Sequence, residues 1–98
     1  MPHFSKEPGF LREFLKLPAE QQLAFMAAVK TYIVKPMQEG RNPASSLFHK
    51  MSGFDTYEFR WDQSGRLRAT CTLFTNAHGE QEIHWRRIGA HDDVYKRP

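Results

Sequence analysis

The hydrophobic pattern of this chain changes its period once, and that change limits the possible folds more than any other feature. In residues 8–40 the apolar residues recur every three or four positions, whereas in residues 57–88 they alternate with polar residues. The first spacing is typical of amphipathic helices and the second of strands with one buried face. The sequence therefore predicts helices followed by antiparallel strands, which is the α+β class.

Two helices are expected in the N-terminal part. The first covers residues 8–16, with Pro8 in a first-turn position and apolar residues at helical spacing, namely Phe10, Leu11, Phe14 and Leu15. The second begins at Pro18 and ends where Pro36 and Gly40 give stop signals. The residues expected on its core-facing stripe are Leu23, Met26, Ala27 and Ile33, widened by Phe25 and Val29.

A meander of three to four antiparallel strands is expected after a loop at residues 41–53, whose Leu47-Phe48 pair would lie on the core. The clearest strands cover residues 57–61, 66–74 and 82–88, separated by turn-forming residues. Alternation places Ile83, Trp85 and Arg87 of the last strand opposite to Glu82, His84, Arg86 and Ile88. With both helices on one face of the sheet, the other face would be left to solvent or a ligand.

The 98 residues are expected to form a single domain, residues 1–98, because no stretch resembles a linker between two cores. The one cysteine, Cys71, can form no internal disulfide and has no Cys or His partners at zinc spacing, so we expect neither a metal nor another cofactor. No run approaches the ~20 apolar residues of a membrane span, and no secretory signal precedes the first helix. We therefore expect a cytoplasmic protein that does not bind membranes.

The net charge of +3 is modest, but the arginines are unevenly placed. Six of the eight lie in residues 60–97, namely Arg60, Arg66, Arg68, Arg86, Arg87 and Arg97. The planar guanidinium group suits phosphate bidentately, so the strand region is the candidate site for a polyanionic partner.

The polar positions of the first two predicted strands bring Glu58 and Arg60 beside Arg66 and Arg68. One interpretation is a solvated face with cross-strand ion pairs worth about 0.2–1 kcal/mol each. The other is a phosphate-binding face. Alternation places most of the neighbouring aromatic rings on the opposite face, which indicates core packing rather than stacking on bases.

The C-terminal segment adds His91, Tyr95, Lys96 and Arg97 directly after the last strand. These residue types match what RNA cleavage needs: a base for the 2′-hydroxyl, a countercharge for the phosphorane and an acid for the leaving oxygen. Histidine titrates near neutral pH and arginine does not, so the roles would fall on different residues. Surface residues without a role are the alternative interpretation.

The order of these elements resembles the RelE/ParE toxin superfamily, in particular its RelE-like mRNA interferases. The strings that carry the resemblance are Leu17-Pro18, Met51-Ser52-Gly53, Tyr57-Glu58-Phe59-Arg60-Trp61, Gly65-Arg66-Leu67-Arg68 and Ile88-Gly89-Ala90-His91-Asp92-Asp93-Val94-Tyr95. It covers nearly the whole chain and implies a RelE-like microbial RNase fold, with the chain as a toxin that cleaves mRNA in the ribosomal A site.

The resemblance also implies roles for particular residues. Arg68 would contact the scissile phosphate, Arg60 matches a basic position, and Glu58 stands where lysine is common and could serve as a carboxylate base. His91 would be an acid or phosphate ligand and Tyr95 would orient or stack on a base. The further residues expected to bind RNA or phosphate are Arg66, Arg86, Lys96 and Arg97.

The expected partners are a small antitoxin protein and mRNA, with the toxin as a monomer or in a hetero-oligomer with its antitoxin. Two alternatives stay open: a ParE-like toxin that inhibits DNA gyrase, and a catalytically inactive RNA-binding member of the same fold. The pair His91 and Tyr95 favours the RNase over the gyrase inhibitor.

Overall fold

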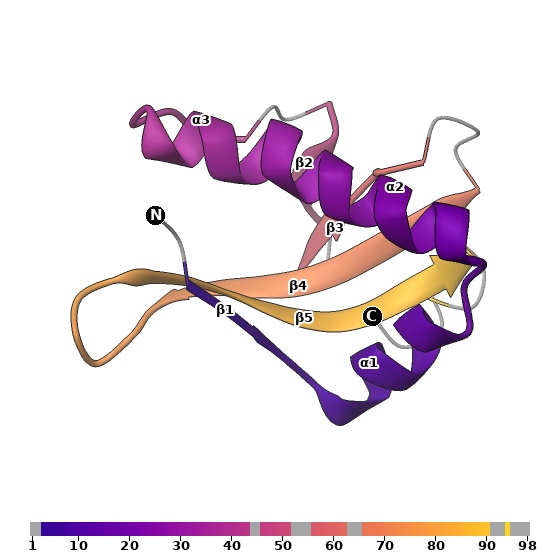
Figure 1. Cartoon of the computed structure of the whole chain (residues 1–98). Helices are drawn as coiled ribbons and strands as arrows, with labels where there is room; N and C mark the ends of the chain where they lie inside the picture. The colour runs from indigo at the N-terminus through magenta and orange to yellow at the C-terminus, as the bar shows by residue number, and fades with distance from the viewer. Residues whose placement is uncertain (1–2, 44–45, 52–55, 63–65, 91–93, 95–98) are drawn as a thin grey trace.

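A computed structural model describes residues 3–43, 46–51, 56–62, 66–90 and 94. The helical segments are α1 (Pro8–Leu15), α2 (Ala19–Val29), the π-helical η1 (Lys30–Val34) and α3 (Lys35–Gln38). The strands are β1 (His3–Lys6), β2 (Phe48–Lys50), β3 (Tyr57–Phe59), β4 (Leu67–Thr75) and β5 (Gln81–Ala90). Figure 1 shows α2, η1 and α3 as one continuous helical rod along the sheet.

All five strands form one mixed sheet in the order β1-β5-β4-β3-β2. The pairs β2–β3, β3–β4 and β4–β5 are antiparallel, and β1 pairs with β5 in parallel. The predicted α+β fold is confirmed, with β1 and β2 as additions to the three strands that the alternation identifies. These two are only four and three residues long, so their alternation is too short to stand out in the sequence.

Of the two predicted stop signals, Pro36 does not end the second helix, whereas Gly40 does lie at its end. The backbone N–H of Lys35 donates to the carbonyl of Lys30, five residues back, and Pro36 then lies in the first turn of α3. Because proline has no N–H to donate, a widened π turn is a way to continue the helix through it. The rod ends near Gly40, whose φ of 75° suits glycine.

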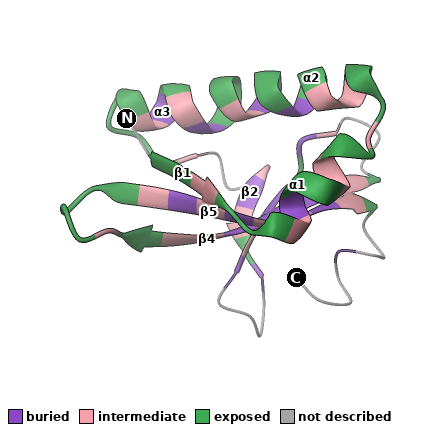
Figure 2. Ribbon diagram, turned by 60° about the horizontal axis from the view of Figure 1, so that its bottom comes forward, coloured by how far each residue is buried: buried purple, intermediate pink, exposed green. Residues whose placement is uncertain are grey.

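The helix stripe predicted to face the core is partly wrong. Phe25, Ala28 and Ile33 are buried, whereas Leu23 and Met26 are 68% and 59% exposed. Figure 2 shows the buried side of this helical rod turned toward the sheet and its exposed side turned outward. The second helix is apolar on more than one side, so its sequence alone does not identify the side that packs.

The core lies between this rod, α1 and the inner face of the sheet. Phe25 is at the centre of an aromatic cluster, with ring centroids 5.2–6.2 Å from those of Phe10, Phe14, Phe59, Trp61 and Trp85. The predicted alternation is confirmed in β4, because its apolar residues Ala69 and Cys71 are completely buried in the core cluster and Leu67 and Leu73 pack against it.

A β-bulge reverses the faces predicted for Arg87 and Ile88 in β5. The register shifts between Thr70 and Cys71, so that Thr70 is opposite Arg87 and Cys71 is opposite Trp85. Ile88 then pairs with Ala69 and is buried in the core, on the same face as Trp85 rather than the opposite one. An extra residue in one strand inverts the alternation beyond it, which sequence periodicity cannot reveal.

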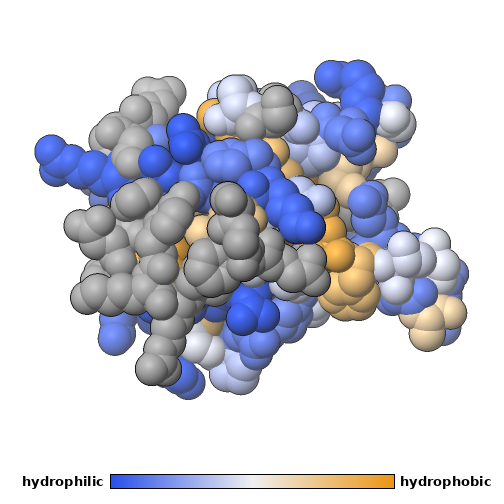
Figure 3. Space-filling model, turned by 180° about the vertical axis from the view of Figure 1, so that it is seen from behind, coloured by the Kyte–Doolittle hydropathy of each residue, from blue (hydrophilic) through white to orange (hydrophobic). Residues whose placement is uncertain are grey.

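Apolar atoms also reach the surface between hydrophilic side chains (Figure 3). The large apolar residues that are exposed are Phe4, Leu11, Leu15, Leu23, Met26, Tyr32 and Phe74. Among the described residues, no helix is long and apolar enough to cross a membrane.

Candidate functional site

The predicted polar residues of β3 and β4 come together around one carboxylate, Glu58. Its Oε1 accepts a hydrogen bond from Arg60 Nε at 2.8 Å and another from Arg68 Nε at 3.2 Å. Arg68 also donates to its neighbour's carbonyl at Leu67, 3.2 Å away. The register explains this meeting, because Glu58 is opposite Thr70 and Arg68 is the next residue of β4 on the same face.

The centre of this face of the sheet is buried rather than open to solvent, contrary to the expectation from the sequence. The Glu58 side chain is 0% exposed and that of Arg68 is 10% exposed, whereas the Arg60 side chain is 47% exposed. Thr70 is also completely buried. A buried carboxylate is tolerated only with charged or hydrogen-bonding partners, which the two arginines provide at Oε1.

The second carboxylate oxygen, Oε2 of Glu58, is buried and has no hydrogen-bond partner within the part of the chain that the structure describes. Buried polar atoms of this kind are rare in folded proteins because desolvation costs about 1–3 kcal/mol. Glu58 therefore holds the two arginines at some cost to stability.

His49 joins the same group, although no sequence pattern singled it out. Its Nε2 is 3.7 Å from Glu58 Oε1, and 34% of its side chain is exposed. It is directly opposite Glu58 in the pairing of β2 with β3, so both side chains lie on one face. The pairing of the short strand β2 with β3 is the signal that places His49 in this cluster.

The other predicted residues are more scattered. Arg66 is exposed just before β4, and Arg86 is partly buried next to the bulge of β5. Arg87 is instead part of the fold, because its Nε and NH2 groups donate to Glu13 of α1 at 2.9 and 2.8 Å. His91, Tyr95, Lys96 and Arg97 lie outside the described residues.

The arrangement can bind an anion and hold it beside a titratable group. Arg60 offers an accessible guanidinium, Arg68 a second and more enclosed one, and His49 an imidazole at the same carboxylate. Arginine contributes charge and fixed donors, whereas histidine can also accept or release a proton. Within the described ranges, no group of three or more His, Cys, Asp or Glu side chains could hold a metal ion.

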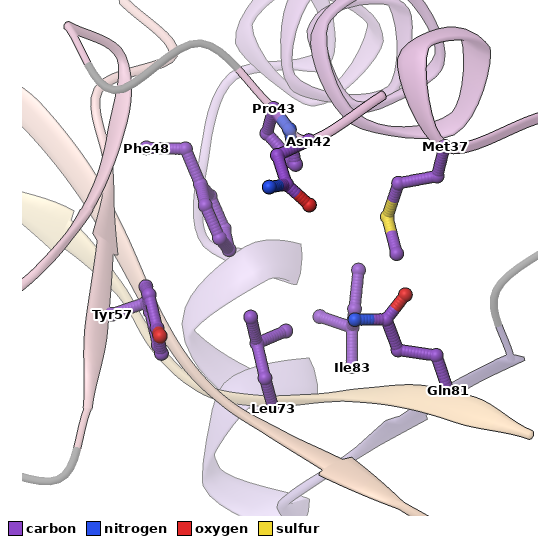
Figure 4. Close-up of a pocket in the computed structure, with 8 residues that line it drawn as sticks. All are labelled: Met37, Asn42, Pro43, Phe48, Tyr57, Leu73, Gln81 and Ile83. Atoms are coloured by element: carbon purple, nitrogen blue, oxygen red, sulfur yellow. The ribbon is translucent and has the colours of Figure 1, made fainter. Parts of the chain in front are cut away.

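A separate cavity of about 280 Å³ opens between α3 and the inner face of the sheet (Figure 4). Its walls combine apolar side chains with the amides of Asn42 and Gln81, which are directed into it. The other residues that line it are Met37, Pro43, Phe48, Tyr57, Leu73 and Ile83. Of the predicted site residues that the structure describes, none lines this cavity.

The fold and the site define a class: a small α+β domain with helices on one face of a mixed sheet and an arginine-carboxylate cluster on the other. No family model matches the sequence, and no curated protein is similar to it. Solved structures share its fold, and two of them are compared with it below.

One neighbour is a chain of the intact RelBE toxin-antitoxin complex of E. coli, with 16% identity and a TM-score of 0.59; the match covers 92% of this chain and 96% of that one. The other is a chain of the RelB-RelE antitoxin-toxin complex of Methanococcus jannaschii, with 16% identity and a TM-score of 0.56, covering 96% and 99%. At this identity the likeness establishes the shared fold, which confirms the predicted fold class.

Proposed function

We propose that this chain is the toxin of a toxin-antitoxin system and that it is an endoribonuclease that cuts mRNA in the ribosomal A site. The observation that carries the proposal is the cluster of Arg60, Glu58 and Arg68 on a fold shared with chains of two toxin-antitoxin complexes. Function depends on such a site rather than on the fold alone.

The toxin is the component that suits this chain. It has its own aromatic core, which is a feature of a domain that folds unaided. An antitoxin that wraps its partner would fold on binding and be poor in such a core. The partner we propose is therefore a small acidic antitoxin, attracted to the positive charge of this chain.

The contacts among Glu58, Arg60 and Arg68 suggest a role for each of them. Arg60 and Arg68 would neutralise the charge that develops on the scissile phosphate, and Glu58 would orient both guanidinium groups. His91 would give a proton to the leaving 5′-oxygen and Tyr95 would stack on a base, as the resemblance implies. The residues proposed to contact the RNA backbone are Arg66, Arg86, Lys96 and Arg97.

The test is cleavage of a defined mRNA on purified ribosomes with an empty A site. We expect the full chain to cut the A-site codon, and a single 2′-deoxynucleotide at the cleavage point to abolish the cut, because the 2′-oxygen is then missing. Arg68→Lys should retain part of the activity that Arg68→Ala loses, because lysine keeps the charge without the planar fork. Arg41→Ala is the matched control, since Arg41 pairs with Glu39 beyond the end of α3.

Intact mRNA in this assay would refute the RNase proposal. Accumulation of DNA breaks linked to gyrase after expression of the chain would favour the ParE-like alternative. Growth arrest that a neighbouring short acidic protein relieves would support a toxin of either kind.

A further inference from the structure

His49 lies on β2, the edge strand of the sheet, and its imidazole reaches the centre of the charged cluster. Arg60 Nε, Arg68 Nε and His49 Nε2 lie 2.8, 3.2 and 3.7 Å from the same atom, Glu58 Oε1. Three groups around one oxygen are necessarily close to one another. A phosphate held by the exposed guanidinium of Arg60 would therefore lie beside the imidazole.

Glu58 is poorly placed to take a proton from a substrate. None of its side chain is exposed, and its Oε1 already accepts from two arginines. A general base must come within about 2.6–3.2 Å of the proton it removes. Glu58 meets that condition only if the cluster opens, whereas His49 is one-third exposed and meets it at the surface.

The cluster otherwise contains no described group suited to proton transfer. The charged groups that face His49 are Glu58 on β3, Arg60 directly after it and Arg68 on β4. Arginine remains protonated at any pH that a protein survives. Histidine is the side chain that exchanges protons near neutral pH.

We propose that His49 is the general base of the cleavage reaction and that Glu58 positions the cluster without touching the substrate. This inference rests on the proposed function and assigns the base within it. His49 Nε2 takes the proton of the 2′-hydroxyl, the 2′-oxygen forms a bond to phosphorus, and the bond from phosphorus to the 5′-oxygen breaks. The 5′-oxygen takes a proton from the general acid, so the products are a 2′,3′-cyclic phosphate and a 5′-hydroxyl.

The experiment measures single-turnover cleavage of ribosome-bound mRNA by the full chain and by His49→Gln across a range of pH. We expect His49→Gln to lower the rate constant about 10²–10⁴-fold at saturating protein, with about the same half-saturating concentration. The pH profile of the variant should lose the limb that rises with deprotonation of the base. In His49→Ala, added imidazole should restore part of the rate, and it should not accelerate the wild type.

His78→Gln is the matched control, because His78 is exposed in the turn between β4 and β5 and should leave the rate unchanged. Circular dichroism of both His49 variants checks that they are folded. Full-rate cleavage by His49→Gln overturns the assignment, as does a loss of rate with an unchanged pH profile and no rescue by imidazole. If the wild type leaves mRNA intact, the proposed function fails first and this inference falls with it.

Discussion

At the scale of single residues, Glu58 and Arg68 depend on each other. Arg68 is a predicted site residue, but it is also one of the two arginines that donate hydrogen bonds to a completely buried carboxylate. Losing one partner of a buried charge costs more than the net value of the pair, because the remaining charge stays desolvated. Substitutions here act on stability as well as on activity.

We expect Arg68→Ala to lower the free energy of unfolding by about 1–3 kcal/mol, since Glu58 retains Arg60 at Oε1. A double-mutant cycle with Glu58→Gln, measured by urea denaturation, should give a coupling energy of about 0.5–3 kcal/mol. Arg41→Ala, at an exposed ion pair, is the control and should change stability little. Zero coupling would show that the two side chains do not interact in solution.

Cys71 gives a prediction about pH. Burial raises the pKa of its thiol far above the ordinary range, so the folded chain keeps the proton that the unfolded chain releases above pH ~8.5. The stability contributed by the protonated thiol is therefore complete below that pH and is lost above it.

Between pH 7.5 and 9.5 this linkage should remove about 1.4 kcal/mol from the free energy of unfolding, and Cys71→Ala should lack that component. The comparison is urea denaturation of both proteins at the two pH values. The thiol of the folded protein should also resist alkylation. Equal pH dependence in the two proteins would contradict the burial of Cys71.

At the scale of elements, α2 shows that the hydrophobic pattern of an apolar helix does not identify the side that is buried. Phe25 and Met26 are neighbours in the sequence, yet Phe25 is at the centre of the aromatic core and Met26 is 59% exposed. The two side chains point about a quarter of a turn apart, and only the position of the sheet decides which one packs.

Alanine substitutions at Phe25 and Met26 provide a matched comparison of a buried and an exposed position on the same helix. Phe25→Ala should destabilise the domain by about 3–5 kcal/mol, because it leaves a cavity among aromatic rings. Met26→Ala should change the free energy of unfolding by no more than about 0.5 kcal/mol. Thermal or urea unfolding measures both, and similar losses in the two variants would mean that the helix is rotated from the orientation described.

At the scale of the whole molecule, both ends of the chain contribute to the fold. Strand β1 at the N-terminal end pairs in parallel with β5, so residues separated by nearly the whole chain are neighbours. Near the C-terminal end, Val94 is completely buried although it is not part of the main core cluster. The predicted site residues His91 and Tyr95 flank this buried position in the sequence.

We expect Val94→Ala to lower the free energy of unfolding by about 2 kcal/mol, from the apolar surface lost and the cavity created. Differential scanning calorimetry of the full chain would measure it. A change below about 0.5 kcal/mol, as is usual at exposed positions, would show that this end does not pack in solution. Truncation from Val94 onward would remove a buried residue together with Tyr95, so a loss of activity could come from lost stability. Tyr95→Phe removes only the hydroxyl group and is therefore the better test of the tyrosine.

The sequence by itself determined the class of fold, the two helical regions, three of the strands and the inward face of β4. Those features depend on periodicities that are local, so a window of residues contains them. It also placed Glu58, Arg60 and Arg68 on one polar face, because alternation along β3 and β4 suffices for that.

Only the tertiary structure decided the side of α2 that packs, the inward turn of Ile88 and the membership of His49 in the cluster. Each of these depends on pairing between segments that are distant along the chain: a helix against a sheet, a bulge between β4 and β5, and an edge strand of three residues. Burial of Glu58 likewise arises from neighbours on several elements, and a local pattern has no information about them.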